Sequence, residues 1–277
     1  MAIFSKSTAN PRGEMSFIGH LEALRWHLVR AAAVMIGFCC VFLFFGDFLF
    51  EKIIFAPLSQ SFPTYGWLCK LGTWLHQEDN ICLTVSGKKL QTLGASEQFT
   101  TYMWICLLAG FIVGFPYLLW ELWKFIRPAL KDKETKPVRG FVFVGTMLFS
   151  MGILFGFFIL FPLSYNFLIN FQISPSFTET NNTLDDYISL ISTMTFVTGI
   201  VFEMPILVYF LSRLGIMSPE FMKKFRRHAV VVLLIIAAII TPSPDITSQM
   251  LVFVPLYFLY EISIFVSKYV VNKYNKT

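Results

Sequence analysis

The strongest constraint on this fold is a pair of apolar segments near the C-terminus, separated only by the turn sequence TPSPD at residues 241–245. The first segment, residues 229–240, follows the basic pair Arg226 and Arg227. As an α-helix it would be about 18 Å long, whereas the apolar core of a bilayer is roughly 30 Å thick. The second segment, residues 246–266, contains Pro255 and Glu261. We therefore expect a hairpin that thins the bilayer locally or packs against longer helices.

Composition supports a membrane protein, because 56% of the residues are hydrophobic and only 14% are charged, against roughly 25% charged residues in soluble domains. We predict an all-α, polytopic fold with six transmembrane helices in one domain, residues 1–277, the last two helices being short. The predicted spans are residues 28–45, 99–123, 140–163, 187–211, 229–240 and 246–266. The net charge of +5 is modest and requires no nucleic-acid partner.

Lysine and arginine are distributed unequally between the segments that join these spans. They concentrate in residues 1–27, 124–139, 212–227 and 268–277, whereas residues 164–186 contain none and the long segment 46–96 contains few. By the positive-inside rule, the first group is cytoplasmic and both termini lie in the cytoplasm. Residues 46–96 and 164–186 are then external loops. The first external loop contains Cys69 and Cys82, which either form a disulfide in an oxidising compartment or remain two free thiols.

Three carboxylates are candidates for function. Glu203 lies inside the fourth predicted span, where a carboxyl group exposed to lipid is costly. It is either a protonated group bonded to a neighbouring helix or a polar contact for the transmembrane helix of a partner. Glu22 and Glu134 lie in predicted cytoplasmic segments. Two such carboxylates can hold two guanidinium groups by charge-assisted hydrogen bonds.

Motifs for catalysis are missing from the sequence. It has no Walker A loop, no HExxH, no CxxC and no GxSxG, so we expect no enzyme activity, no metal and no cofactor. A proton- or ion-coupled small-solute transporter is the main alternative function, with Glu203 as the relay. Such a transporter needs several ionisable groups near the middle of the membrane, where Glu203 is nearly alone. A purely structural scaffold is the other alternative.

A series of short motifs resembles the TatC family of twin-arginine translocase proteins. In order they are HLEALR (20–25), FAPL (55–58), FP (115–116), WKFIRPAL (123–130) with Glu134, FPL (161–163), FEMP (202–205), LGI (214–216), TPSPD (241–245), SQ (248–249), PL (255–256) and LYE (259–261). Each motif alone is weak, but their order is specific and covers nearly the whole chain outside the first external loop.

The resemblance implies a receptor in the bacterial cytoplasmic membrane for folded cargo proteins that carry Arg-Arg signal peptides. In that family the N-terminal segment and the loop between the second and third spans bind the signal peptide. The corresponding residues here are Glu134, Glu22, Arg25, Phe125 and Pro128. The implied mechanism is binding and assembly, driven by the proton gradient.

The resemblance also implies a glove-like, concave arrangement of helices against which single-span subunits of the TatA and TatB type pack. Glu203 and Gln249 are the implied intramembrane polar residues for such partners, and Pro57 and Asp245 belong to external turns. Membrane lipid and further copies of the chain are the other expected partners.

The sequence departs from the family pattern at several positions. The family glutamate of the first motif aligns with Ala23, so Glu22 is displaced by one residue, or about 100° around a helix. Met103 stands where a lysine is common, and Glu121 stands where glutamine is more usual. The turn before Asp245 has one additional residue.

Overall fold

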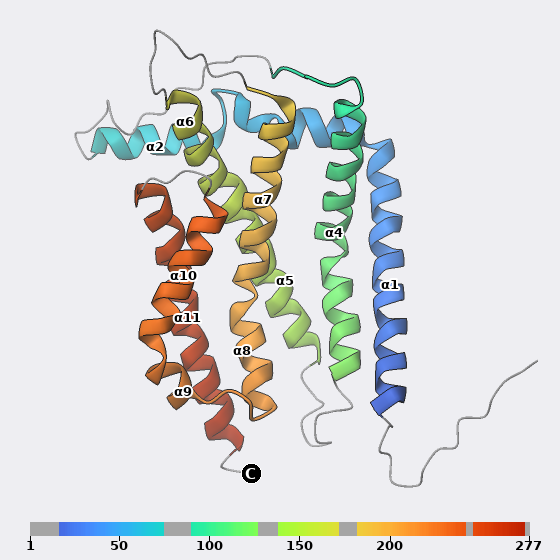
Figure 1. The fold of residues 1–277 in the computed structure, drawn as a ribbon, viewed down its shortest axis with the longest axis vertical. Helices are drawn as coiled ribbons and strands as arrows, with labels where there is room; N and C mark the ends of the chain where they lie inside the picture. The colour runs from blue at the N-terminus through green and yellow to red at the C-terminus, as the bar shows by residue number, and fades with distance from the viewer. Residues whose placement is uncertain (1–16, 75–89, 127–137, 172–181, 242–245, 275–277) are drawn as a thin grey trace, which may run out of the picture.

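The computed structural model describes residues 17–74, 90–126, 138–171, 182–241 and 246–274, which form a bundle of helices (Figure 1). The elements are α1 (Phe17–Phe44), η1 (Phe48–Ile54), η2 (Ala56–Leu58), α2 (Pro63–Trp74), α4 (Glu97–Ile126), α5 (Val138–Phe155), η5 (Gly156–Leu160), α6 (Phe161–Asn170), α7 (Leu184–Phe202), α8 (Met204–Arg213), α9 (Pro219–Lys224), α10 (Arg226–Ile240) and α11 (Ile246–Tyr274). Within these ranges five helices are long and apolar enough to cross a membrane. The predicted all-α membrane fold is confirmed.

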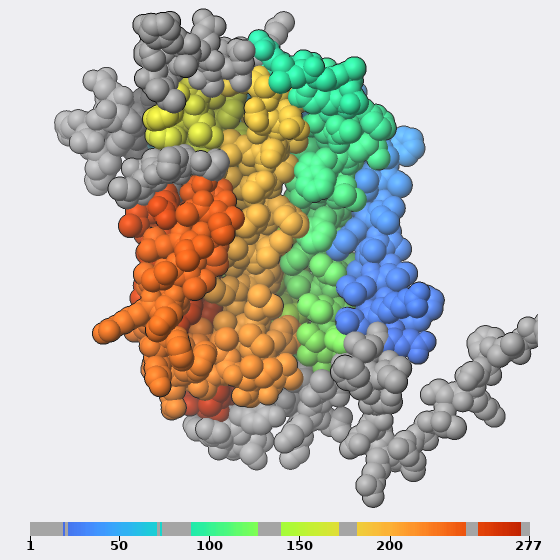
Figure 2. Space-filling view, viewed as in Figure 1, coloured from blue at the N-terminus to red at the C-terminus, as the bar shows by residue number. Residues whose placement is uncertain are grey.

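Small residues set the closest helix contacts. Gly110 and Gly114 of α4 face Met35 and Cys39 of α1, and a Cβ at Gly110 would lie 2.7 Å from the Cys39 backbone nitrogen. Gly152 of α5 and Gly156 of η5 pack in the same way against α7. Glycines four residues apart allow helix backbones to approach closely within a membrane. Two tight helix pairs, α1 with α4 and α5 with α7, result, and Figure 2 shows α7 lying between α4 and α10 on one face of the bundle.

Proline interrupts two of the predicted spans. The third span runs as α5, the π-helical turn η5 and then α6, which has Pro162 in its first turn. The fourth span is divided into α7 and α8 at Glu203, two residues before Pro205. Because proline has no backbone N–H, it fits the first turn of a new helical segment better than the interior of an old one. By contrast, Pro116 lies inside the continuous helix α4.

A clamp joins the beginnings of α4 and α7 at the upper end of Figure 1. The Glu97 carboxylate accepts hydrogen bonds from the backbone N–H groups of Leu93, Gly94 and Asp185, at 2.6, 3.0 and 3.1 Å. An isolated parallel bridge between Gln91 and Thr183 lies beside it. The beginning of α1 and the end of α11 lie at the opposite, lower end (Figure 1).

Two features differ from the sequence-based expectation. The last two helices are not both short, because α11 has 29 residues and continues beyond the predicted end at Val266, whereas α10 has only 15. Periodicity of hydrophobic residues could not locate that end, since α11 remains helical through its polar last turns. In addition, part of the segment predicted as a long loop is helical, because η1, η2 and α2 all lie within residues 46–96.

Candidate functional site at the lower ends of α1 and α4

The packing of α1 along α4 brings three predicted site residues to one end of the bundle. Glu22 and Arg25 lie in the first third of α1 and are exposed to solvent or lipid. Phe125 lies in the last turn of α4 and is partly buried. Pro128 and Glu134, the two other predicted residues of this surface, lie outside the described residues. The described half of the predicted surface is thus formed by the two helices together.

A buried carboxylate lies directly behind this surface. Glu121 of α4 is only 2% exposed and accepts hydrogen bonds from the Tyr117 hydroxyl at 2.9 Å and the Lys124 ammonium group at 3.3 Å. Its second oxygen lies 2.5 Å from Nδ1 of His27 on α1. The His27 ring in turn contacts the Phe125 ring edge-on, with 6.3 Å between centroids. Glu121 therefore connects α1, the last turns of α4 and the predicted docking residue Phe125.

The sequence-based reasoning missed this network. Its only signal was that Glu121 occupies a position where the related family more usually has glutamine. The partner, His27, lies 94 residues away and no spacing rule joins the two. Lys124 is held further by the ring of Trp120, with 3.4 Å between Nζ and the ring centroid. Such a cation–π contact fixes the ammonium group beside the carboxylate.

Glu203 lies at the break between α7 and α8 and is 7% exposed. Its carboxylate points toward α5, where a Cβ at Gly145 would lie 3.5 Å from Oε2. It also faces the backbone of Phe149, but within the described ranges no group lies in hydrogen-bonding geometry to either oxygen. A buried carboxyl group without a partner is unusual in a native structure. Glu203 is thus available for a polar contact that the described residues do not themselves provide.

Gln249 is more fully satisfied than the sequence suggested. Its side-chain amide donates to the Leu234 carbonyl at 3.2 Å, which ties α11 to α10. A second tie between the same helices joins Arg226 to Glu261, with 2.7 Å between Nη2 and Oε2. These contacts hold the short helix α10 against the longer α11, so Gln249 has a structural role within the hairpin. Asp245 lies outside the described residues.

The residues predicted for the external side are partly described. Pro57 is buried in η2, and its carbonyl accepts a hydrogen bond of 2.7 Å from the Tyr65 hydroxyl. Burial, with a smaller contribution from Tyr165, raises the pKa of Tyr65, so this donor remains protonated. Cys69 takes part in a disulfide bond. Because Cys82 lies outside the described residues, the predicted Cys69–Cys82 pair stays a prediction.

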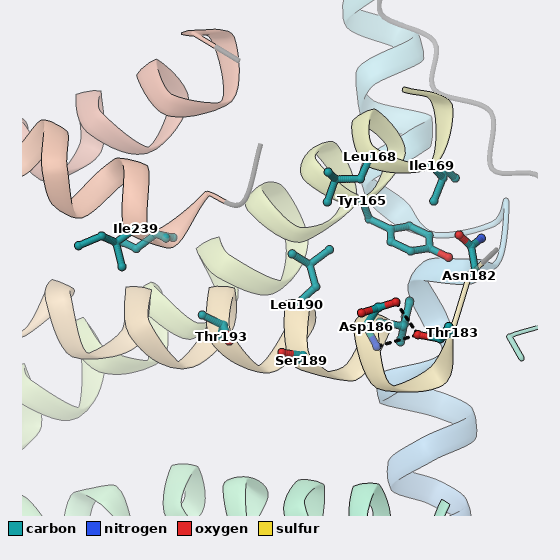
Figure 3. Close-up of a pocket in the computed structure, with 12 residues that line it drawn as sticks. Tyr165, Leu168, Ile169, Asn182, Thr183, Asp186, Ser189, Leu190, Thr193 and Ile239 are labelled. Atoms are coloured by element: carbon teal, nitrogen blue, oxygen red, sulfur yellow. Dashed lines mark hydrogen bonds between the residues drawn. The ribbon is translucent and has the colours of Figure 1, made fainter. Parts of the chain in front are cut away.

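A cavity of about 460 Å³ lies above the end of α10, between α6 and α7 (Figure 3). Ile239 and Ile240 of α10 line one wall, and α7 lines the other. The wall from α7 contains the polar residues Asp186, Ser189 and Thr193 beside Tyr187 and Leu190. The cavity exists because α10 ends lower than α6 and α7 (Figure 1). The short helix therefore leaves polar side chains of α7 uncovered.

Comparison with known proteins decides the family. The family model described as "Sec-independent protein translocase protein (TatC)" matches residues 19–255. The chain belongs to the TatC family. A TatC protein of Blattabacterium sp. subsp. Periplaneta americana is 41% identical over 95% of this chain and 99% of its own length. The TatC protein of Aquifex aeolicus is 32% identical over 94% of this chain and 97% of its own length.

Solved structures agree with this assignment. A crystal structure of a protein described as the twin arginine translocase receptor TatC superposes with a TM-score of 0.69 at 31% identity, covering 91% of this chain and 99% of that one. A second TatC structure, in the detergent DDM, gives a TM-score of 0.70. The family resemblance inferred from the motifs is confirmed. This TatC chain is a multi-pass membrane protein and a component of a Sec-independent protein translocase, a transport family and not an enzyme family.

Proposed function

We propose that this chain is the receptor subunit of the translocase and binds Arg-Arg signal peptides at the lower ends of α1 and α4. The observation that carries the proposal is the side-by-side packing of these helices, which brings Glu22, Arg25 and Phe125 to one end of the bundle. The related protein of known crystal structure is likewise described as a twin arginine translocase receptor. In this proposal the lower end faces the cytoplasm of a bacterial inner membrane, in accordance with the distribution of basic residues.

Docking is electrostatic at first. A planar guanidinium group forms paired hydrogen bonds with a carboxylate, which a lysine ammonium group cannot reproduce. Glu134 accepts one cargo arginine, Glu22 is the candidate acceptor for the other, and Phe125 and Pro128 shape the apolar part of the surface. Arg25, three residues after Glu22 on α1, belongs to the same proposed surface.

Assembly follows docking in this proposal. The apolar part of the signal enters along the face of the bundle near Glu203, whose carboxylate is without a partner in the described chain. The Glu203 carboxyl group then forms a hydrogen bond with a polar residue in the transmembrane helix of a single-span TatA- or TatB-type subunit. The proton gradient supplies the energy. Because α10 is short, the bilayer beside it is expected to be thin, and the membrane opens most easily there.

The first prediction tests docking. Glu134→Ala or Glu134→Lys is expected to abolish crosslinking of a photoreactive Arg-Arg signal peptide to the protein in membrane vesicles. Asp132→Ala, which removes another acid from the same segment, is the matched control and should crosslink normally. A Lys-Lys peptide should crosslink weakly to every variant. Unchanged crosslinking to the Glu134 variants would show that the docking assignment is wrong.

A further inference from the structure

An apolar cavity of about 530 Å³ separates the two tight helix pairs near the upper end of the bundle. Its walls come from α1, η1, α4, α5, η5 and α7, and they include Phe42, Leu49, Leu108, Ile112, Phe157 and Ile191. Phe62 and Pro63, at the start of α2, close it toward the upper end. Its volume lies within the range of about 300–1,000 Å³ that is typical of small-ligand sites. The cavity is therefore large enough for an occupant that is mainly apolar.

Two polar groups on the α7 wall of this cavity are unsatisfied. Ser192 and Thr195 are only 5% and 7% exposed, and neither hydroxyl has a hydrogen-bond partner within the described ranges. Thr198, one turn further along, shows the usual alternative, because its hydroxyl bonds to backbone carbonyls of α5 and α7. Buried hydroxyl groups in native proteins are almost always bonded. The cavity thus presents two donors that require an acceptor oxygen from its occupant.

A cation stands at the same cavity. Lys52 of η1 lines it and is exposed, with its ammonium group 5.7 Å from the centroid of the Phe48 ring. In the part of the chain that the structure describes, Lys52 has no carboxylate within ion-pair distance. Figure 1 shows η1 and α2 crossing the upper end of the bundle roughly at right angles to the long helices. Amphipathic helices in this orientation are typical of the lipid headgroup level.

We propose that this cavity binds one glycerophospholipid. An acyl chain lies along the apolar walls, the ester oxygens accept hydrogen bonds from Ser192 and Thr195, and the phosphate pairs with Lys52. A transmembrane helix fits less well, because its backbone oxygens are already bonded within the helix and so offer no free acceptor to Ser192 and Thr195. The lipid fills the space between the α1–α4 pair and the α5–α7 pair, independently of where a signal peptide docks.

Native mass spectrometry of the detergent-purified protein tests the proposal. The protein is titrated with phosphatidylglycerol and, separately, with diacylglycerol of the same chains, which lacks the phosphate. The wild type should retain one phosphatidylglycerol and bind diacylglycerol at least ten-fold more weakly. Lys52→Glu should weaken phosphatidylglycerol binding at least ten-fold. Lys70→Glu, an equal charge change on the exposed face of α2 and outside the cavity, is the matched control and should bind as the wild type does.

Two further variants test the interior. Ser192→Ala combined with Thr195→Val removes both hydroxyls at nearly constant volume and should weaken binding several-fold. Ala109→Leu adds bulk to the wall and should exclude the lipid. Thermal melting of each variant identifies any that fail to fold. If an interior variant fails to fold, the Lys52→Glu variant still tests the proposal, because Lys52 is exposed.

Several results would overturn the proposal. The first is that both Lys52→Glu and Ala109→Leu bind phosphatidylglycerol as tightly as the wild type does. The second is that Lys70→Glu weakens this binding as much as Lys52→Glu does. The third is that the wild type binds diacylglycerol as tightly as phosphatidylglycerol. A photocrosslinker at position 109 that captures a single-span subunit or a signal peptide in native membranes, and no lipid, would also contradict it.

Discussion

At the scale of single residues, buried Glu121 is the least expected feature. It contacts three potential donors from two helices, and one of them, His27, comes from α1. Sequence motifs pointed to Glu22 and Glu134 because both acids lie in segments that resemble cytoplasmic motifs of the family. They could not predict the network, since a contact between residues 27 and 121 depends on how α1 packs along α4. The sequence shows which residues can form hydrogen bonds, but it does not show that His27 and Glu121 lie next to each other.

The second prediction concerns this pair. His27→Ala should destabilise the protein by about 1–3 kcal/mol, because it removes one partner of a buried carboxylate while Tyr117 and Lys124 remain. Glu121→Gln should cost less, since the amide still accepts hydrogen bonds and carries no charge. Thermal unfolding in detergent measures both, and the double variant gives the coupling between them. Additive effects of the two single changes would argue against a direct interaction.

Glu203 and Gln249, two polar residues in apolar segments, differ in whether the side chain has a hydrogen-bond partner within the described residues. Sequence alone treated them alike, as polar contacts for partners. In the structure Gln249 is bonded within the α10–α11 hairpin, whereas the carboxylate of Glu203 has no such bond in the described chain. Whether such a polar group is bonded depends on the donors and acceptors that tertiary packing places around it. Glu203 is therefore the stronger candidate contact for a partner, and the role predicted for Gln249 stays a prediction.

At the scale of helices, the helical character of the apolar segments followed from hydropathy, whereas their irregularities did not. Apolar runs located the helices because each must satisfy its own backbone hydrogen bonds within lipid. The break at Glu203 and the π-helical turn before Pro162 required knowledge of which carbonyls the prolines leave free. The length of α11 was underestimated for a similar reason, since helical structure continues where hydropathy falls. Helix boundaries are the least predictable feature of such a chain.

The third prediction tests the contact between η5 and α7. Gly156→Leu should destabilise the protein by about 1–3 kcal/mol, because overpacking forces backbones apart. A Cβ at this position would lie 2.7 Å from the Met194 carbonyl oxygen. Gly37→Leu is the control, since nothing lies within 4 Å of a Cβ there. Thermal unfolding of the two variants should separate them clearly, and equal melting temperatures would contradict the proposed packing.

At the scale of the whole molecule, one short helix lies among long ones. Helix α10 has 15 residues and is about 22 Å long, less than the roughly 30 Å apolar thickness of a bilayer. Its ties to α11 prevent it from tilting independently. Above its end, Asp186, Ser189 and Thr193 of α7 are left uncovered, and such polar groups favour contact with water over lipid. The bilayer should therefore be thinnest on this side of the protein.

The fourth prediction follows from this mismatch. In phosphatidylcholine vesicles of increasing chain length, the melting temperature of the wild type should fall as the bilayer thickens. Seven apolar residues inserted into α10 add about 10 Å and rotate the helix face by only about 20°. The bilayer thickness that gives the highest melting temperature should therefore be greater for this variant than for the wild type. The same seven residues appended after Thr277 provide the control, and an identical dependence in all three proteins would exclude thinning by α10.

The Glu97 clamp limits how the bundle can deform. It holds the first turns of α4 and α7 together through one carboxylate and an adjacent backbone bridge. If these helices separate, the joint favours a hinge at their first turns, and displacement would then grow with distance from it. Separation of the far ends would also have to part Trp123 of α4 from Phe210 of α8, whose ring centroids are 5.7 Å apart. The clamp and this ring contact therefore hold the two spans together at both ends of the bundle.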